Sequence, residues 1–301
     1  MKIIKVIIYG LLSIVGIICI LLFEINGLPV GSSLGGLLAG FTLPLAYQSI
    51  VDLSDDEDWK TTQRKLLRGK FISKDTIIRL SFAYLYRIKN GNDYFLIKNT
   101  RGTEKFQPVG GVYKTTPEEA LLLKNKFHAI DDDKIPVDRS SELDYRLRIP
   151  SKYLRSFIRR FNSKKSQRER ISDVSRELKE ELVRTGVVSW KAIRYRYCGR
   201  YITNLKYEDH FQCYEIQLFD IIELLPTKEQ EQEIENMKSA SSNIFSFATA
   251  EEIKALGINT DEKQLRETIG SHTQYILQEN EHLLMSEKDQ GKVFDVALEN
   301  N

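Results

Sequence analysis

The chain has 301 residues, which is long enough for one large domain or two small ones. Its formal net charge of +2 gives no overall electrostatic attraction to nucleic acid, so we expect neither DNA nor RNA as a partner. Three cysteines are too few for a disulfide framework and favour a reduced, cytoplasmic soluble part. Cys198 and Cys213 with His210 are an alternative metal site, but their spacing matches no zinc pattern.

Two apolar stretches near the N-terminus are each long enough to cross the roughly 30 Å hydrocarbon layer as a helix. They cover residues 6–23 and 30–51, and the turn sequence 26–29 separates them. A signal peptide is the competing interpretation of the first stretch, because Lys2 and Lys5 precede it. However, no small-residue cleavage site follows, and a second span does. Residues 1–53 are therefore predicted to form a two-helix transmembrane hairpin.

The charges that flank the hairpin predict its orientation. The short connection carries Glu24 and no Lys or Arg, whereas the other ends are flanked by Lys2, Lys5, Lys60, Arg64, Lys65 and Arg68. By the positive-inside rule both termini and the soluble part face the cytoplasm, in a multi-pass arrangement.

Glycines in the second span are predicted to allow close helix association. Gly31, Gly35, Gly36 and Gly40 give small-xxx-small spacing twice. The alternative is that glycine is simply frequent in membrane helices. Neither span contains a residue charged at neutral pH, so ion-binding or proton-relay chemistry is not expected there.

The rest of the chain divides into a linker at 54–75, a folded body at 76–285 and a disordered tail at 286–301. Strands at 77–88 and 94–98 form a hairpin around Asn90-Gly91. A loop then ends in Pro108-Val109-Gly110-Gly111, where adjacent glycines allow the backbone to approach a ligand. Further elements are a helix starting at 116, a strand at 143–149, a helix at 153–161, strands at 187–202, 211–225 and 245–247, and a closing helix at 261–279.

Three glutamates crowd the helix that we expect over residues 166–186, where Ser166 and Glu169 have capping-box spacing and Gly186 is a stop signal. Glu177 lies three and four residues from Glu180 and Glu181, so like charges are neighbours on the helix surface. A divalent cation such as Mg²⁺ would stabilise such a cluster. The alternative is a solvated acidic face.

Basic residues are concentrated in two segments. On the strand at 187–202, Arg194, Arg196 and Arg200 are expected on one face with no facing acids, which favours contact with phosphates. The helix at 153–161 and the segment after it also form a predicted patch for a nucleotide or an anionic membrane, with a solvated face as the alternative. This patch contains Arg155, Arg159, Arg160, Lys164, Lys165, Arg168 and Arg170.

A strand hairpin, a Pro/Gly-Gly loop and a helix bearing Arg176-Glu177-x-x-Glu180-Glu181 resemble the Nudix family. The resemblance implies an α/β/α sandwich with an insertion, and an α+β chain overall. It also implies that Glu177, Glu180 and Glu181 bind Mg²⁺ if the site is active. Gly110, Gly111, Arg176, Arg194, Arg196 and Arg200 are the expected ligand-binding residues.

The sequence departs from the Nudix pattern in spacing. A long insertion separates Gly111 from Arg176, and the glycine expected soon after the last glutamate appears only at Gly186. Counting strictly from Gly110 places the signature helix at 117–127, where Lys124 and Asn125 replace Arg-Glu and the site is degenerate. The two possible positions of the signature helix make opposite predictions, because the later helix gives an intact metal site and the earlier helix a degenerate one. We prefer the later helix because its glutamates match.

The combination of a membrane hairpin with a divergent Nudix-like domain resembles the membrane effectors of bacterial CBASS antiphage systems, which are CD-NTase-associated proteins with a SMODS-associated Nudix-like domain. The resemblance implies that the domain senses a cyclic nucleotide made by a partner CD-NTase. It also implies homo-oligomerisation on activation, disruption of the inner membrane and abortive infection.

Two alternatives remain open at this point. One is a membrane-tethered Mg²⁺-dependent hydrolase of a nucleoside diphosphate derivative, and the other is an anchored scaffold without a ligand. The resemblance in architecture favours sensing over catalysis, and no general base can be assigned from the sequence. His128, His210, His272 and His282 all lie outside recognisable motifs.

Overall fold

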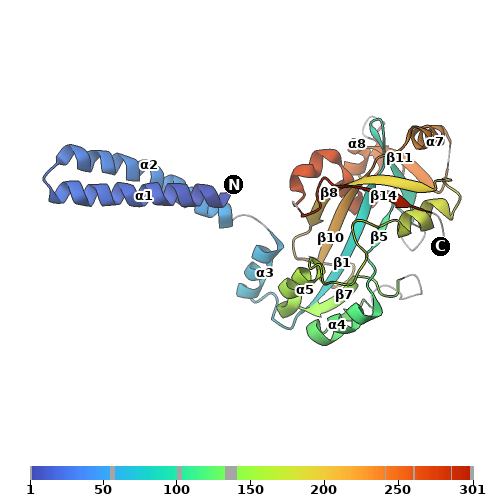
Figure 1. Ribbon diagram of the computed structural model, residues 1–301, viewed down its shortest axis with the longest axis horizontal. Coiled ribbons are helices and arrows are strands. Elements are labelled where there is room, and N and C mark those ends of the chain that lie inside the picture. Colours follow the sequence, from blue (N-terminus) through green and yellow to red (C-terminus); the bar gives the residue numbers. More distant parts are fainter. Residues whose placement is uncertain are drawn as a thin grey trace. The chain divides into compact units, whose positions relative to one another are not determined.

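The computed structural model describes residues 2–54, 58–99, 104–132, 141–240, 242–259, 262–285 and 287–298. The chain forms two compact units, Met1–Gly69 and Lys70–Asn301 (Figure 1). The first unit is helical and the second is a mixed α/β domain, so the expected α+β architecture is confirmed.

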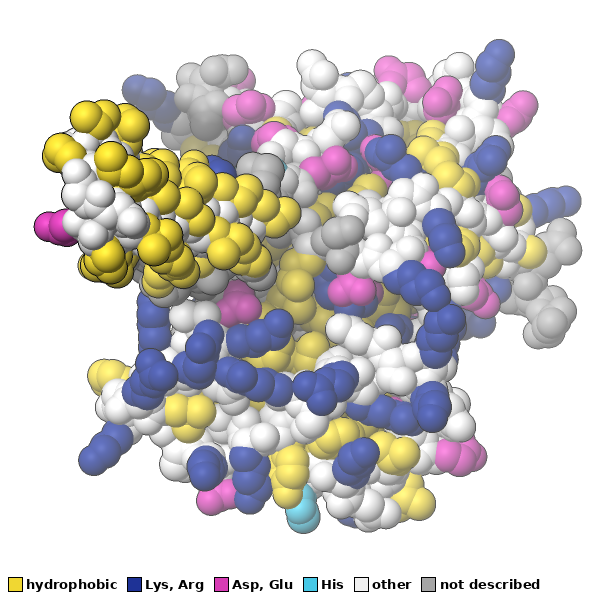
Figure 2. Space-filling view, turned by 60° about the vertical axis from the view of Figure 1, so that its left-hand side comes forward, with side chains coloured by type: hydrophobic (Ala, Val, Ile, Leu, Met, Phe, Trp, Pro, Cys, Tyr) yellow, Lys and Arg dark blue, Asp and Glu magenta, His cyan; other side chains and the backbone are white. Residues whose placement is uncertain are grey.

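Helices α1 (Lys2–Ile25) and α2 (Pro29–Ser54) form the predicted hairpin, with Gly27 at φ +66° in the turn. Segments Ile4–Ile25 and Pro29–Ile50, 22 residues each, are long and apolar enough to cross a membrane. Hydrophobic side chains cover the outside of the hairpin (Figure 2). Such a surface is unfavourable in water and suits a lipid environment.

Close backbone contact holds the two helices together. A Cβ on Gly16 would lie 2.8 Å from the Ala39 nitrogen, and one on Gly35 would lie 2.9 Å from the Gly16 carbonyl oxygen. The Ser13 hydroxyl also donates a buried hydrogen bond of 2.9 Å to Thr42 Oγ1. These contacts match the small-residue and hydroxyl packing that is usual between membrane helices.

The segment expected as a linker contains a third helix, α3 (Trp59–Arg68). Asp58 caps it, because its carboxylate accepts a hydrogen bond of 2.8 Å from the Thr61 amide. The acidic residues before the helix suggested only a loop, yet Asp58 is a helix-start signal.

The larger sheet of the second unit has eight strands, of which β1 (Ile77–Arg87) is central. It pairs in parallel with β10 (Cys213–Leu224) and antiparallel with β5 (Gly110–Val112) and β7 (Arg146–Pro150). Nearly every residue of β1 is buried, which explains why its sequence reads as an apolar and aromatic run. The sheet is completed by β6 (Ile130–Asp131), β8 (Ala192–Ile202), β9 (Lys206–Glu208) and β14 (Val293–Ala297).

The smaller sheet contains the return strand of the predicted hairpin, β3 (Asp93–Lys98), and the strand near residue 245, β11 (Phe245–Thr249). Gly91, at φ +59°, makes the turn that the sequence predicted. The remaining strands are β2 (Lys89–Asn90) and β4 (Phe106–Gln107), and β12 (Ile258–Asn259) pairs separately with β13 (Gln264–Leu265).

The insertion between the glycine loop and the glutamate helix extends the larger sheet. It contributes α4 (Pro117–Phe127), β6, β7, a 3₁₀ turn (Ser151–Tyr153) and α5 (Leu154–Phe161). Phe157 and Phe161 of α5 pack edge-on against Phe82 of β1, with the Phe161 and Phe82 ring centroids 4.8 Å apart. The insertion therefore belongs to the domain core.

Two of our expectations about the C-terminal part are wrong. The expected helix over 261–279 is replaced by β13 and by 3₁₀ helices at Ser271–Ile276 and Gln278–Leu283, while 260 and 261 lie outside the described residues. The expected disordered tail contains β14, which pairs with β8. Its partner strand lies almost a hundred residues earlier, so a local sequence pattern could not identify it. Helix α7 (Lys228–Lys238) was not predicted, and a short helix, α8 (Ala250–Lys254), follows β11.

Candidate functional site

The glycine loop and the glutamate helix, 65 residues apart between Gly111 and Arg176, meet in the structure. A Cβ on Gly111 would collide with the Glu177 side chain, and a Cβ on Gly110 would collide with the Tyr84 carbonyl oxygen. The Gly110 amide also donates a hydrogen bond of 3.3 Å to Glu181 Oε2. The later helix is thus the one that faces the glycine loop, as we preferred.

The helix itself is shorter than the sequence indicated. Instead of one helix over 166–186, there is an α-helical turn, α6 (Arg176–Leu178), which continues as a π-helix (Lys179–Val183). Ser166 is buried and its hydroxyl bonds to Tyr145 and Glu119, so it does not cap this helix. Gly186, at φ +73°, follows the last turn. A π-helical turn is rare and is often found at functional sites.

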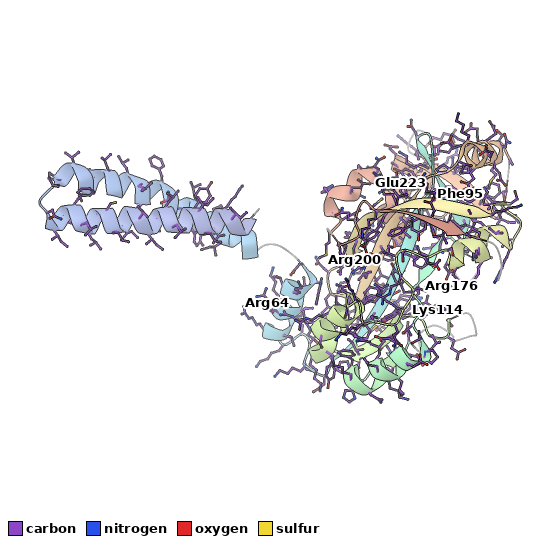
Figure 3. The ribbon with its side chains drawn as sticks, viewed as in Figure 1. Arg64, Phe95, Lys114, Arg176, Arg200 and Glu223 are labelled. Atoms are coloured by element: carbon purple, nitrogen blue, oxygen red, sulfur yellow. The ribbon has the colours of Figure 1, made fainter. Side chains whose placement is uncertain are left out.

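Arg176 lies at the centre of the site, close to Lys114 (Figure 3). Its Nε donates to Glu169 Oε1 at 2.7 Å, its Nη2 donates to the Val112 carbonyl at 2.8 Å, and its Nη1 donates to Glu177. Glu180 Oε2 is 3.9 Å from Nη1. Burial would lower the pKa of Arg176, but hydrogen bonding to Glu169 and the surrounding negative charge raise it overall.

Glu169 is a site residue that the sequence reasoning missed. We interpreted it as a helix-capping residue, whereas its two oxygens accept from Arg176 Nε and, at 2.8 Å, from the Lys114 amide. It therefore connects the strand after the glycine loop to the glutamate helix. An acidic residue seven positions before Arg176 was the available signal, but only the tertiary structure shows that it turns toward the guanidinium.

Tyr84 lies beneath these charges on β1, directly opposite Gly111 in the strand register. Its hydroxyl is buried and has no hydrogen-bond partner among the described residues. Burial first, and the nearby Glu169 carboxylate second, raise the pKa of Tyr84 well above its usual value. The hydroxyl therefore stays protonated and is a potential donor at the floor of the site.

The three glutamates have the oxygen chemistry that Mg²⁺ prefers, but they do not converge. Glu177 is buried against Arg176, Glu181 accepts from Gly110, and Glu180 is about one-third exposed. Within the residues that the structure describes, no three His, Cys, Asp or Glu side chains are arranged to hold a metal ion. The guanidinium of Arg176 places one positive charge beside Glu177 and Glu180.

The expected row of three unpaired arginines on β8 is wrong. A register shift between β8 and β10 at Gly199 moves Arg200 into the buried interior, where it pairs with Asp220. Arg196 pairs with Glu223, and Arg194 lies 3.5 Å from Asp295 of β14. All three arginines thus have acidic partners from strands that are distant in sequence.

Arg194 and Arg196 also lie away from the glutamate helix. Tyr195, between them, points to the opposite face of β8, where its hydroxyl donates to the Ile171 carbonyl at 2.9 Å, just before the helix. The structure thus gathers Gly110, Gly111, Arg176, Glu177 and Glu181, and leaves Arg194, Arg196 and Arg200 outside.

The predicted basic patch of the insertion is only partly exposed. Arg160 donates to Glu119, and Arg168 lies flat on the ring of Phe161, 3.8 Å from its centroid. Arg155, Arg159, Lys164, Lys165 and Arg170 remain exposed.

The histidines and cysteines form no site with these residues. His272 is stacked on Phe219, and burial, with a smaller effect from Lys105, lowers its pKa to about 4. His128 ends α4, and His210 lies in the turn between β9 and β10. Within the described residues, none of the three cysteines forms a disulfide.

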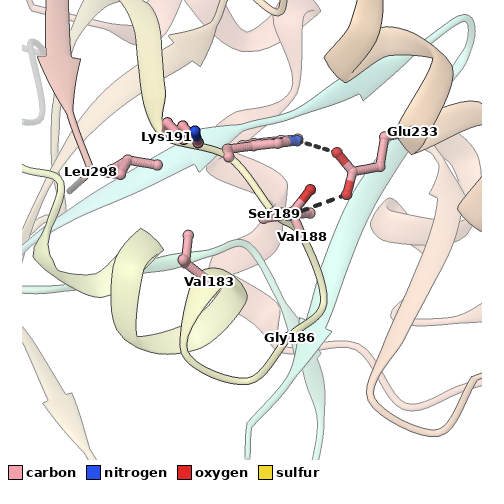
Figure 4. A pocket seen from close by; sticks show the side chains of 8 residues that line it. Val183, Gly186, Val188, Ser189, Lys191, Glu233 and Leu298 are labelled. Atoms are coloured by element: carbon pink, nitrogen blue, oxygen red, sulfur yellow. Dashed lines mark hydrogen bonds between the residues drawn. The ribbon is translucent and has the colours of Figure 1, made fainter. Parts of the chain in front are cut away.

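A separate hollow lies behind the end of the π-helix (Figure 4). The indole Nε1 of Trp190 donates to Glu233 Oε2 at 2.7 Å, and the Ser189 amide donates to Oε1 at 3.2 Å. The lining contains Val183 and Leu298, but neither the loop glycines Gly110 and Gly111 nor the three glutamates of the glutamate helix. We assign it no function.

A glycine loop packed on an Arg-Glu-x-x-Glu-Glu helix, over a mixed sheet, defines a Nudix-like domain. The chain belongs to the family of SMODS-associated NUDIX domains, whose family model matches residues 77–277. No curated protein and no solved structure gives a significant match.

Proposed function

We propose that this protein is a membrane effector of a bacterial antiphage CBASS system. In this proposal the Nudix-like domain binds a cyclic nucleotide made by a CD-NTase, and the hairpins then disrupt the inner membrane and cause abortive infection. The observation that carries the proposal is the presence, in one chain, of a SMODS-associated domain and two helices apolar enough to span a bilayer.

The charge arrangement at the site favours sensing over catalysis. Arg176 already pairs with the carboxylates of Glu169 and Glu177 and offsets part of their negative charge, so less positive charge would have to come from a metal ion. We propose that the ligand contacts Gly110, Gly111 and Arg176. In such a site a phosphate would compete with the carboxylates for the guanidinium, which has more than one donor edge.

Ligand binding acts on the membrane only if it stabilises one state of the protein more than another, because a ligand shifts an equilibrium by its differential affinity. In the proposed mechanism, the ligand-bound domains associate and bring several hairpins together. With the soluble domain in the cytoplasm, as the flanking lysines and arginines favour, the ligand and its sensor share a compartment.

A membrane-tethered Mg²⁺-dependent Nudix hydrolase is the second candidate function. The observation that favours it is that the matching glutamates lie against the glycine loop. Glu177, Glu180 and Glu181 would hold the metal, which would supply electrostatic stabilisation of a cleaved phosphoanhydride. This requires the Glu177 carboxylate to leave Arg176.

One experiment separates the candidates. The full chain is reconstituted in dye-loaded vesicles, and synthetic cyclic di- and trinucleotides are added, with and without Mg²⁺, while dye release and nucleotide cleavage are both measured. Sensing predicts that the nucleotide causes dye release without being cleaved, and that this release is retained in Glu180→Gln/Glu181→Gln. Catalysis predicts Mg²⁺-dependent cleavage that this variant loses. Neither activity in the wild type would leave an anchored scaffold and overturn the proposal.

A further inference from the structure

The chain enters the Nudix-like domain through an exposed basic and aromatic segment. Lys70 and Lys74 are exposed, and Phe71 between them has 73% of its surface exposed. Ile72, by contrast, is buried and fixes the segment to the domain. An aromatic ring exposed to water forgoes the free energy of apolar burial unless it finds an apolar partner.

The exposed surface continues onto α5. The Lys152 amide donates to the Lys74 carbonyl at 2.9 Å, and the Ser151 amide donates to the Thr76 carbonyl at 2.8 Å. The two segments therefore lie side by side. Leu154, Phe157 and Ile158 bury the inner side of α5, so the exposed side chains at positions 152, 155 and 159 share the outer side.

We define the entry surface as Lys70, Phe71, Lys74, Lys152, Arg155 and Arg159. Asp75 lies within it and pairs with Lys152 at 2.7 Å, so positive charge exceeds negative charge. A surface of this kind attracts anionic lipid, and the attraction falls off within a Debye length.

The length of the chain limits how far this surface can lie from the hairpin. Ser54 ends α2, and of the 16 residues from there to Lys70, ten form α3. Ten helical residues span about 15 Å, and the other six reach at most ~20 Å when fully extended. The chain that joins Ser54 to Lys70 can therefore reach at most roughly 35 Å, and so short a tether keeps the effective concentration of this surface at a membrane high.

We infer that the entry surface binds the anionic lipid headgroups of the membrane that the hairpin spans, with Phe71 inserted at the interface between headgroups and acyl chains. The inference rests on the proposed function in that it takes the hairpin to be in a bilayer. The Lys and Arg groups contact lipid phosphates, and the Phe71 ring gains the apolar partner that it lacks in water. The Nudix-like domain is then held against the bilayer by two independent attachments.

The test uses the full chain with Phe71→Trp, reconstituted in vesicles that contain brominated phosphatidylcholine as a fluorescence quencher. The parent chain already contains Trp59 and Trp190. Its emission is therefore subtracted, and the measured quantity is the quenching of the additional emission from the introduced Trp. The control is Leu265→Trp in β13, an apolar position that is also well exposed, with 63% of its surface exposed. Vesicles are made with and without phosphatidylglycerol.

We expect strong quenching of Trp emission at position 71 in the anionic vesicles, a loss of roughly half or more of that quenching in high salt, and little quenching at position 265. Adding Lys74→Gln/Lys152→Gln to Phe71→Trp should cause the same loss. The matched control pair is Lys191→Gln/Lys228→Gln, where Lys191 directly precedes β8 and Lys228 begins α7. This pair should not reduce the quenching. Figure 1 shows α7 at the other end of the domain from α5.

Three outcomes would overturn the inference. One is equal quenching at positions 71 and 265, and another is quenching that does not depend on anionic lipid. The third is a saturable change in Trp emission at position 71 when soluble tripolyphosphate is added to the protein in neutral vesicles. That result would show that the surface binds a free anion and not lipid headgroups. A chain that fails to float with either vesicle would instead contradict the membrane hairpin, and with it the proposed function.

Discussion

Arg200 and Asp220 face each other across β8 and β10 and form a bidentate pair, with Nε to Oδ1 at 2.7 Å and Nη2 to Oδ2 at 2.8 Å. Both side chains are almost fully buried. Arg200 Nη1 also reaches Asn162 of the insertion at 2.6 Å and Glu287 of the C-terminal segment at 3.2 Å. This pair therefore joins the larger sheet to the end of α5 and to the C-terminal segment beyond residue 277, where the family match ends.

Breaking the pair should destabilise the domain strongly. Asp220→Asn removes the buried counter-charge of Arg200 and leaves the partly exposed Glu287 as its acidic partner. Removing one partner of a buried ion pair costs about 3–5 kcal/mol. Replacing both residues, as in Arg200→Met/Asp220→Leu, should cost less than Asp220→Asn alone. Thermal unfolding of the full chain in detergent measures both variants. A double variant that is less stable than the single one would contradict this account.

The same pair predicts a pH dependence. Burial would raise the pKa of Asp220, but the charge and hydrogen bonds of Arg200, with hydrogen bonds from Tyr113 and Tyr197, lower it overall. A carboxyl group with a depressed folded-state pKa stabilises the protein above its unfolded pKa of about 3.9, and that stabilisation is lost as the pH falls through the folded-state value. The wild type should therefore lose more stability than Asp220→Asn on acidification from neutral pH. Parallel losses in the two proteins would contradict the assignment.

Local sequence signals predicted much of this fold, and they failed where a distant partner decides the structure. Gly91, the Thr116 cap of α4 and Gly186 act as their residue types indicated. Arg200 was misplaced because the bulge at Gly199 reverses the alternation of the strand, although a glycine inside a strand is itself a bulge signal.

In the candidate site, too, local sequence signals identified some residues, whereas those whose partners are distant in sequence were missed or misplaced. The spacing of Arg176, Glu177 and Glu181 identified the helix, and the paired glycines identified the loop. Glu169 was missed because its capping-box spacing with Ser166 describes a local helix that does not form. The ionic partners of Arg194 and Arg196 come from β14 and β10, so no inspection of β8 alone could find them.

The glycine loop gives a sharply defined prediction. The three atoms nearest to a Cβ on Gly111 all belong to the Glu177 side chain. Gly111→Ala should therefore destabilise the domain by about 1–3 kcal/mol, as overpacking does. Glu177→Ser should relieve that collision, so that Gly111→Ala costs little in its presence.

Denaturant unfolding of the four proteins in this double-mutant cycle measures the coupling between residues 111 and 177. Additive losses of stability would show that the loop does not press on Glu177. Gly110→Ala provides a comparison, because its Cβ would meet the Tyr84 backbone and Glu177→Ser should not rescue it.

Arg176 should control whether the site responds to a divalent cation. In Arg176→Gln, the carboxylates of Glu169, Glu177 and Glu180 lose their nearby positive charge, and like charges left together attract a cation. We expect Mg²⁺ to raise the Tm of Arg176→Gln more than that of the wild type. Lys114→Gln is the control, since Glu169 accepts from the Lys114 backbone amide, which this substitution keeps. An equal effect of Mg²⁺ on wild type and Arg176→Gln would contradict neutralisation by Arg176.

The four glycines of the second span separate into two groups. Gly31 packs against the Phe23 ring and Gly35 against the backbone of α1, so both are used within the hairpin. Gly36 and Gly40 have no atom within 4 Å of an added Cβ and lie four residues apart on the outer side of α2. If hairpins associate through glycine-mediated packing, Gly36 and Gly40 are the positions available for it.

Gly36→Leu/Gly40→Leu should therefore reduce crosslinked multimers of the full chain in native membranes and abolish dye release, while the hairpin itself still forms. Gly10→Leu is the matched control, because Gly10 is equally open but lies on α1. Gly35→Leu should instead disrupt packing within the hairpin, since its Cβ position is already within 2.9 Å of the Gly16 carbonyl oxygen. If the multimers persist in Gly36→Leu/Gly40→Leu but are lost in Gly10→Leu, the hairpins associate through α1 and not through α2.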